Sequence, residues 1–392
     1  MANTTSDPLP AGPPGGVAAG CLDATRGPLH PLAAATLGAA ADLAWADPTR
    51  RHGPGRRARG LLDTAREVLA GALGVRPDEL SVHASAEDAL SVGLEGLRHA
   101  RRRVGERVVA SAVERTAVLV RTGDEAPVPV SRSGVVDVAA LVAALARPGT
   151  AAVVLQTANG EVGTRQPVAA VAAAAREAGV PLLLDATTSL GRDPLPAGAG
   201  DVVVADAASF GGPPLGLLGV RSGARWGLPG PRREAEQGRA LAAPWVPLVL
   251  AAAEAWRQGE AAADEDATSA RALVDRLRAA AGAVPDVQVV GDPQDRLPHV
   301  VTFSVLYVDG ETVVDELARH DLAVGSGSAC TSSTLRPSHV LAALGVLTHG
   351  NVRVTLPLAS VSPHRADDVD RLCALLPDVV AGLRARLGVA DL

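Results

Sequence analysis

Apolar residues recur along the first half of the chain at two different spacings. In Arg57–Leu73 and Ala86–Ala100 they fall three and four residues apart, which predicts two amphipathic helices. Short runs rich in β-branched residues predict strands at Arg107–Ala112, Ala151–Gln156, Val180–Asp185 and Asp201–Ala205. Helical patterns at Val136–Ala146 and Pro167–Ala178 separate some of these strands. We therefore expect a mainly parallel sheet that is buried on both faces.

The pattern changes in the second half of the chain. Glycine, proline and arginine interrupt it at Gly223–Pro231, and a long helical stretch follows at Val246–Ala281. Two strand-like runs and three helical segments come next: His299–Val305, Asn351–Leu356, Glu311–His320, Pro337–Leu344 and Arg365–Leu387. This order predicts a smaller α+β unit appended to the parallel-sheet domain. Ligands of the α/β domain should bind where its strands end.

Composition narrows the class of protein. The chain of 392 residues is 47% hydrophobic and 20% charged, which is ordinary for a globular protein of two or three domains. Its net charge of −6 gives no reason to expect nucleic acid, and no apolar run reaches the roughly 20 residues of a membrane span. Residues 1–18 are rich in proline and glycine and predict a disordered arm rather than a signal peptide.

Three cysteines, Cys21, Cys330 and Cys373, are too few and too scattered for a disulfide scaffold or a metal cluster. We therefore expect a cytoplasmic, reducing environment. The 392 residues include no lysine, so all 37 residues counted as lysine or arginine are arginine. Genomic base composition can account for that bias at surface positions. It cannot account for a position where chemistry requires an amine.

One segment stands out for its chemistry. Gly325–Ser338 reads GSGSACTSSTLRPS, a run of small residues around Cys330. A thiol on an exposed loop can attack a substrate and then carry sulfur outward. The alternative is a buried structural cysteine in a serine-rich turn, and spacing alone gives the two readings about equal weight.

The same segment resembles the active-site loop of cysteine desulfurases, and further segments resemble that family in the same order. They are CLDATRGPLHP at Cys21–Pro31, ANGEVGTRQ at Ala158–Gln166, LLLDATTSLG at Leu182–Gly191 and VRVTL at Val352–Leu356. The chain is thus similar to cysteine desulfurases over more than three hundred residues. These are class V aminotransferases, which use pyridoxal phosphate (PLP) and feed iron–sulfur cluster assembly and tRNA thiolation.

The resemblance implies a fold and three residue roles. The fold would be the PLP-dependent transferase fold type I, with a large α/β domain at 33–256 and a small α+β domain made of 19–32 and 257–392. Cys330 would hold sulfur as a persulfide. Asp185 would pair with the protonated ring nitrogen of PLP, and Arg353 would grip the substrate carboxylate. For Asp185 and Arg353 the alternatives are a helix N-cap and a surface cation. A dimer is also expected by resemblance.

The chain departs from the family where PLP would be held covalently. The family's segment reads Ser-x-His-Lys-x-x-Gly-Pro-Lys-Gly, whereas Asp206–Gly216 reads DAASFGGPPLG. Aligning Gly212-Pro213 places Ala208 at the histidine and Ser209 at the lysine. A hydroxyl cannot form an imine with an aldehyde. Because the 392 residues contain no lysine, no shift of the alignment restores one.

Other expected cofactor contacts differ too. The phosphate turn reads HASAEDA at His83–Ala89, where Ala86 precedes Glu87 at the family's threonine position. A carboxylate near a phosphate costs on the order of 1–4 kcal/mol. Alternatively, Glu87 and Asp88 simply complement the dipole of the helix that follows. The ring-stacking histidine corresponds to Arg115, which cannot shuttle protons as imidazole does.

Three further differences lie in the same set of contacts. Gly160 stands at the family's second asparagine and Thr188 at its glutamine. The phosphate contact that the other subunit gives in the family has no clear counterpart in Gln237–Pro244. Together these changes predict a degenerate PLP site.

We consider three hypotheses. The first is a pseudoenzyme that keeps the fold, the dimer surface and the Cys330 loop; it would accept persulfide sulfur, pair with an active homologue or occupy a scaffold partner. The second is an active cysteine desulfurase that uses PLP without an internal aldimine. The third is a new enzyme whose Ser209, Arg115 and Arg353 bind an anionic ligand. The sequence shows no Ser-His-Asp or metal-ligand spacing that would specify the chemistry of the third hypothesis. We expect His30, His83 and His339 to be surface or loop residues.

Overall fold

The larger of two sheets forms the centre of the computed structural model, which describes residues 19–123, 125–326 and 337–389. Its six strands lie in the order β1-β6-β5-β4-β3-β2. They span Leu80–His83 (β1), Arg107–Ala110 (β2), Thr150–Gln156 (β3), Leu182–Asp185 (β4), Val202–Asp206 (β5) and Gly216–Val220 (β6). Strands β2 to β5 run parallel, which confirms the mainly parallel α/β sheet.

Strands β6 and β1 were missing from the predicted pattern. Strand β6 pairs antiparallel with β5 on one side and with β1 on the other. Only the short helix η1 (Ala207–Phe210) and a turn separate β5 from β6. A parallel crossover needs a dozen or more residues, so this short connection forces β6 to return antiparallel.

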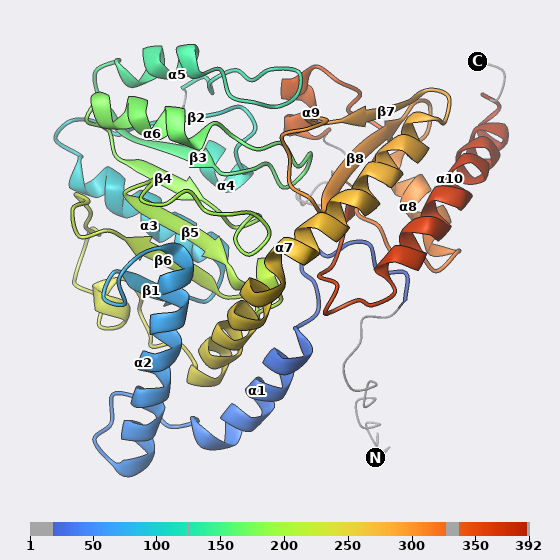
Figure 1. Cartoon of the computed structure of the whole chain (residues 1–392). Helices are drawn as coiled ribbons and strands as arrows, with labels where there is room; N and C mark the ends of the chain where they lie inside the picture. Colours follow the sequence, from blue (N-terminus) through green and yellow to red (C-terminus); the bar gives the residue numbers. More distant parts are fainter. Residues whose placement is uncertain (1–18, 124, 327–336, 390–392) are drawn as a thin grey trace, which may run out of the picture.

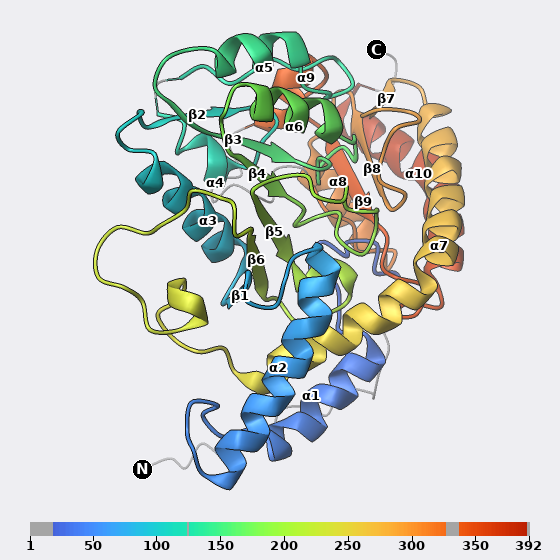
Figure 2. The same cartoon turned by 60° about the vertical axis from the view of Figure 1, so that its left-hand side comes forward.

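Helices cover both faces of the large sheet, as Figures 1 and 2 show. Helix α3 (Ala86–Ala100) packs Leu90, Leu94 and Leu97 on one face. The other face is covered by α2 (Gly53–Leu73), α5 (Val138–Leu145), α6 (Val168–Glu177) and the first part of α7 (Val246–Gly282). The expected burial on both faces is confirmed, and α3 has the predicted bounds.

A second sheet lies beside the first and has the order β7-β8-β9. Its antiparallel strands are Val287–Val290 (β7), Val300–Val305 (β8) and Asn351–Thr355 (β9). They share an apolar core with the last part of α7, α8 (Gly310–Ala318) and α10 (Arg365–Leu387). Leu22, from the start of the described chain, joins this core. The domain boundaries given above stay a prediction.

Helix α7 connects the two cores, because its 37 residues span about 55 Å. Val249 and Ala252 pack in the first core, and Leu273 and Leu277 in the second. Between them, Asp266 accepts hydrogen bonds from Arg365 Nη1 at 2.7 Å and Arg192 Nη1 at 3.3 Å. Burial lowers the pKa of Arg192 to about 10.

The remaining helices are α1 (Pro31–Leu43), α4 (Thr116–Leu119), η2 (Glu236–Gly238) and α9 (His339–Leu344). Helix α1 packs against α7. Among the described residues, no helix has the length and apolar character to cross a membrane.

Candidate functional site

The carboxyl ends of the parallel strands bring two aspartates together. Asp185 ends β4 and Asp206 ends β5, and the two strands are neighbours. Asp185 is only 2% exposed. Its Oδ1 accepts hydrogen bonds from the Thr187 amide at 2.9 Å and the Thr187 hydroxyl at 2.6 Å. Its Oδ2 is buried and has no hydrogen-bond partner among the described residues. Among the described residues, this buried oxygen is therefore an unused acceptor at the carboxyl end of β4.

A line of contacts runs from Asp185 to the start of α3. Arg115 donates from Nη1 to Thr187 Oγ1 at 2.9 Å and from Nη2 to Glu87 Oε1 at 2.7 Å. We call Asp185, Thr187, Arg115 and Glu87 the Arg115 relay. Arg26 approaches the same Glu87 oxygen to 3.9 Å. The sequence placed Glu87 and Arg115 at two separate cofactor contacts, and the fold joins them in an ion pair.

Electrostatics favour the charged forms of both residues. Burial opposes ionisation of Glu87, but its own backbone N–H and the Arg115 guanidinium outweigh burial and lower its pKa. Burial also opposes the charge on Arg115, yet Asp185 and Glu87 together raise the pKa of Arg115. Burial raises the pKa of Asp206, and the negative charge of the neighbouring Glu87 adds to this rise.

Ala86 and Glu87 begin α3, and Ser85 caps that helix by accepting from the Asp88 amide at 3.1 Å. Ala86 itself is buried, at 1% exposure. The two acidic residues in the first turn lie where they complement the helix dipole, as the alternative reading expected.

Ser209, which the sequence pattern predicts at the position of the family's lysine, lies in η1 directly after β5. Its Oγ is 2.7 Å from the carbonyl oxygens of both Leu190 and Asp206, so its single proton is donated to the backbone. Its own carbonyl accepts from Arg192 Nε at 3.0 Å. In the part of the chain that the structure describes, no base holds this hydroxyl as an activated nucleophile.

Gly160 and Thr188, two other departures from the family, touch each other. A Cβ built on Gly160 would lie 2.7 Å from Thr188 Cγ2. The Thr188 hydroxyl donates to the Ala158 carbonyl at 3.2 Å. A larger residue at 160 would collide with Thr188, so these two changes are sterically coupled.

A second cluster surrounds Arg353 on β9. Arg353 is 4% exposed, so it is not a surface cation. Its Nη2 donates to Thr25 Oγ1 at 3.1 Å and lies 4.0 Å from Asp23 Oδ1. Burial raises the pKa of Glu161 to about 7, against the opposing effects of Ser338 and Arg353. We call Arg353, Glu161, Thr25 and Ser338 the Arg353 corner.

Two buried atoms of the Arg353 corner, Arg353 Nε and Glu161 Oε1, have no hydrogen-bond partner within the described ranges. Cys330 falls in 327–336, outside those ranges, so its role stays a prediction. The chain on either side is described. Gly325 forms a backbone bridge with Arg353 through bonds of 2.9 and 2.7 Å. Ser338 is the N-cap of α9, and His339 Nε2 lies 2.9 Å from the Glu114 carbonyl.

Glu114 is a buried acid that the sequence did not single out. It is 0% exposed, and burial raises its pKa to about 8, with the nearby charge of Asp185 adding to the effect. Hydrogen bonds from the Gln156 amide and the Ser111 hydroxyl oppose this rise. Glu114 is therefore largely protonated near neutral pH.

The structure also corrects the expectations for two histidines. His83 lies within β1 and is 3% exposed; its Nδ1 is 3.0 Å from Asp88 and its Nε2 is 3.2 Å from Ser81 Oγ. A serine–histidine–aspartate line therefore exists that spacing did not suggest. Ser81 is 0% exposed and lies 3.3 Å from the Leu218 carbonyl, so no substrate can reach it. His30 is likewise buried, as the N-cap of α1.

These residues fit PLP at one point and fail at two. Asp185 Oδ2 is the buried acceptor that a protonated ring nitrogen requires. The chain offers no lysine for an imine, and Ser209 is turned to backbone carbonyls. The Glu87 carboxylate lies at the start of the helix where a phosphate would bind. The residues present therefore do not fit covalently held PLP.

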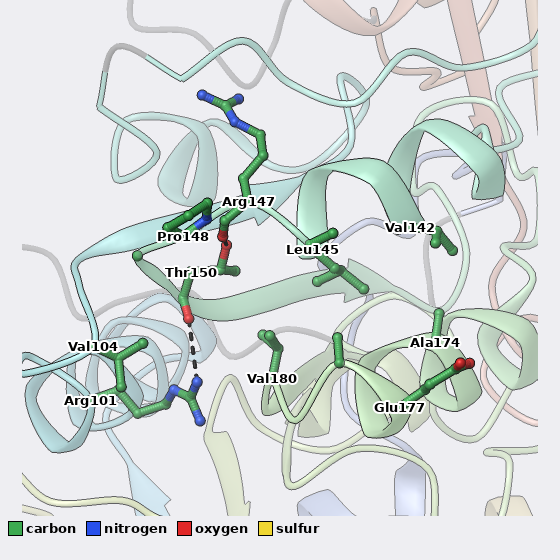
Figure 3. A pocket seen from close by; sticks show the side chains of 13 residues that line it. Arg101, Val104, Val142, Leu145, Arg147, Pro148, Thr150, Ala174, Glu177 and Val180 are labelled. Atoms are coloured by element: carbon green, nitrogen blue, oxygen red, sulfur yellow. Dashed lines mark hydrogen bonds between the residues drawn. The ribbon is translucent and has the colours of Figure 1, made fainter.

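A separate pocket of about 430 Å³ lies at the opposite edge of the sheet (Figure 3). It is lined by the first residue of β3, Thr150, and by residues of α5 and α6, and Arg101 donates to the Thr150 carbonyl. Strand β3 places it roughly 20 Å from the Asp185 end. Among the described residues, no group of three or more His, Cys, Asp or Glu side chains could hold a metal.

Known proteins similar to this chain share one family. The sequence matches the family described as Aminotransferase class-V over residues 46–213 and 230–372. It is 32% identical to the cysteine desulfurase IscS of Pectobacterium atrosepticum, over 79% of each chain. It is 30% identical to cysteine desulfurase IscS 1 of Archaeoglobus fulgidus, over 87% of this chain and 91% of that one. A solved NifS-like protein superposes with a TM-score of 0.83 at 22% identity, over 93% of this chain and 100% of the other.

Proposed function

Since the chain belongs to the class V aminotransferases, and among them to the cysteine desulfurase family, we propose that it is a sulfur-carrying member of that family that does not release sulfur from cysteine itself. Cys330 would accept sulfur from a persulfide made elsewhere and pass it to an acceptor thiol. The fold would then serve as a carrier and docking platform.

The observation that carries this proposal is the chemistry at Ser209. Desulfuration of a free amino acid by PLP begins from an imine, and the family makes that imine with a lysine. Ser209 stands at this position with its hydroxyl bonded to backbone carbonyls. Replacement by a hydroxyl removes the covalent step, while the thiol of Cys330 does not depend on it.

The sulfur transfer balances without a redox partner. The Cys330 thiolate attacks the outer sulfur of a donor persulfide, a new S–S bond forms, and the donor's S–S bond breaks to release the donor thiolate. An acceptor thiolate then attacks the outer sulfur of Cys330 in the same way. No net oxidation occurs, so neither a cofactor nor an oxidant is required.

The Arg353 corner supports this role because it bonds to the chain on both sides of residues 327–336. Gly325 pairs with the backbone of Arg353, and Ser338 bonds with Glu161. By contrast, burial raises the pKa of the Cys21 and Cys373 thiols, which lowers their share of reactive thiolate.

We propose that the protein works as a dimer, either with itself or with an active homologue. Large apolar side chains are exposed at and just after the end of α1 and before α7: Leu43 (53%), Trp45 (63%), Leu241 (82%) and Trp245 (50%). Such surface is costly in water and is typical of an interface. A sulfur-acceptor or scaffold protein would bind separately, near the Arg353 corner.

A second candidate is an active desulfurase that binds PLP without an internal aldimine. Asp185 Oδ2 favours it, because this oxygen has no partner in the described part of the chain and would accept from a ring nitrogen. The Glu87 carboxylate opposes it. A third candidate, a new enzyme for an anionic ligand built on Ser209, Arg115 and Arg353, lacks an activated nucleophile among the described residues.

The test combines a spectrum with a mass measurement. We expect the purified protein to be colourless and to gain no stoichiometric imine absorbance with PLP. Treated with a small-molecule persulfide, it should gain one sulfur atom at Cys330, and a second protein thiol should then remove it. The Cys330→Ser variant should not gain this sulfur, whereas the matched Cys373→Ser control should.

Sulfide production from cysteine plus PLP, lost in Cys330→Ser, would instead establish the second candidate. Equal sulfur gain by Cys330→Ser and by the unaltered protein would contradict the carrier role.

A further inference from the structure

The first turn of α3 holds a carboxylate where an anion would be most strongly attracted. Helix α3 has 15 residues and follows β1, whose carboxyl end lies at the same edge of the sheet as those of β4 and β5. Glu87 lies in this turn, and its own backbone N–H contributes to holding its pKa low. Its carboxylate therefore uses the field that a helix start offers to a phosphate.

Arg115, at the N-cap of α4, holds that carboxylate in an ion pair. The guanidinium bonds to Glu87 at 2.7 Å and to Thr187 at 2.9 Å, and Thr187 in turn bonds to Asp185 at 2.6 Å. Arg26 adds a second positive charge 3.9 Å from Glu87. The cations that face the helix start are thus already engaged by a side chain of the same protein.

The remaining charges near this pair also oppose a further anion. Asp185 and Asp206 act on Arg115 together with Glu87, so three carboxylates share the two guanidinium groups of Arg115 and Arg26. A phosphate group placed beside Glu87 would add negative charge to a region that already has an excess. Its attraction to the helix start would be offset by repulsion over a few ångströms.

We propose that Glu87 is a built-in anion at the start of α3. It occupies the position where the family would bind a phosphate and excludes phosphate-bearing ligands from it. Arg115 holds Glu87 in place. This inference deepens the proposed function, on which it rests, because it gives a reason why the start of α3 would bind no cofactor phosphate. It also makes Glu87 the residue that decides which ligand class can enter.

The probes are inorganic phosphate and pyridoxine 5′-phosphate, which carries the ring and the phosphate but no aldehyde. Binding is measured by isothermal titration calorimetry with the whole chain. Glu87→Thr should increase the affinity for both probes by about tenfold or more, because it removes the competing carboxylate and frees Arg115. Each probe should raise the thermal unfolding midpoint of Glu87→Thr and leave that of the unaltered protein unchanged.

Two further variants separate this idea from a general loosening of the cleft. Arg115→Ala breaks the same ion pair but leaves Glu87 in the helix start, so it should gain no affinity. The double variant Glu87→Thr/Arg115→Ala should gain less than Glu87→Thr. Asp88→Thr is the matched control. It also removes one carboxylate from the first turn of α3, but that carboxylate contacts His83 and not Arg115. It should leave both affinities unchanged.

Circular dichroism confirms that each variant is folded before the titrations. Equal affinity of Glu87→Thr and the unaltered protein for both probes would overturn the inference. It would also be wrong if the unaltered protein and Asp88→Thr both bound either probe tightly and with equal affinity. Neither result bears on sulfur transfer through Cys330, which is measured separately, so the two proposals fail independently.

Discussion

The Arg115 relay and the Arg353 corner are adjacent, yet they differ in how their buried polar groups are satisfied. In the relay, Glu87, Arg115 and Thr187 bond to one another, and Asp185 Oδ2 is the acceptor left over. In the corner, both Arg353 Nε and Glu161 Oε1 are buried without a partner in the described residues. Buried polar groups normally have partners. Among the described residues, the relay therefore leaves one buried polar atom without a partner and the corner leaves two.

Three short stretches of chain join the two regions. Thr25 bonds to Arg353, while Arg26, the next residue, approaches Glu87. Glu114, which precedes Arg115, lies beside His339, the residue after Ser338. Gly160, which precedes Glu161, lies beside Thr188, the residue after Thr187. Changes at these joins therefore test whether the two regions act separately.

The largest effect is expected at Glu114. Its pKa of about 8 lies well above the ordinary value of 4.5, so the folded protein keeps a proton that the unfolded chain loses. Stability should therefore fall as pH rises from about 5 to about 9. Glu114→Gln lacks this loss, so relative to the unaltered protein it should gain on the order of 2–4 kcal/mol over that range.

Urea unfolding at several pH values measures this difference. Glu67→Gln, on the surface of α2, is the control and should track the unaltered protein. A constant gap between Glu114→Gln and the unaltered protein at all pH values would show that Glu114 is ionised throughout.

An intermediate effect is expected at the contact between Gly160 and Thr188. Gly160→Ala places a Cβ 2.7 Å from Thr188 Cγ2, and overpacking of this kind costs about 1–3 kcal/mol. Thr188→Ser removes the methyl group and keeps the hydroxyl that bonds to Ala158. The double variant should recover most of the loss in denaturant unfolding.

Gly38→Ala is the control for the glycine substitution. Gly38 lies in α1, and nothing comes within 4 Å of a Cβ built on it. This change should be neutral or slightly stabilising. If Thr188→Ser failed to relieve Gly160→Ala, the proposed coupling between the two departures would be wrong.

The smallest effect is expected from the Arg115–Glu87 pair itself. Its side chains are 31% and 44% exposed, so a double-mutant cycle with Arg115→Ala and Glu87→Gln should give about 0.2–1 kcal/mol of coupling. Added salt should weaken it. The more exposed pair Arg59–Asp63 provides the comparison and should show less. A larger, salt-independent coupling would mean that the relay is a buried structural element.

Much of the fold could be predicted because the spacing of apolar residues along the sequence indicates helices and strands. The helices at Ala86–Ala100 and Arg365–Leu387 have the predicted bounds, since long amphipathic patterns leave few alternatives. Strand β1 was not predicted, because four residues with serine and histidine between apolar positions give a weak strand signal. Strand β6 was missed because its Gly-Leu-Leu-Gly-Val run follows a glycine- and proline-rich turn.

Asp185, Arg353, Glu87, Arg115, Ser209 and Thr188 were named from the family pattern, and their roles in a site stay predictions. The structure shows that Arg115 contacts Glu87 and Thr187, and that Thr187 contacts Asp185. The ion pair between Glu87 and Arg115 was not foreseen, because 28 residues separate them along the chain. Glu114 was not identified either, since an acid beside Arg115 looks ordinary until its burial is known.

The sequence by itself determined the chemistry that is possible: a chain without lysine cannot hold PLP through a lysine imine, and Cys330 remains as a thiol in a small-residue segment. The tertiary structure alone decided which charges meet. It paired Glu87 with Arg115, buried His83 between Ser81 and Asp88, and left Asp185 Oδ2 without a donor among the described residues. The reason is physical, because residue type fixes what a group can bond to, whereas partners, burial and pKa depend on contacts between distant parts of the chain.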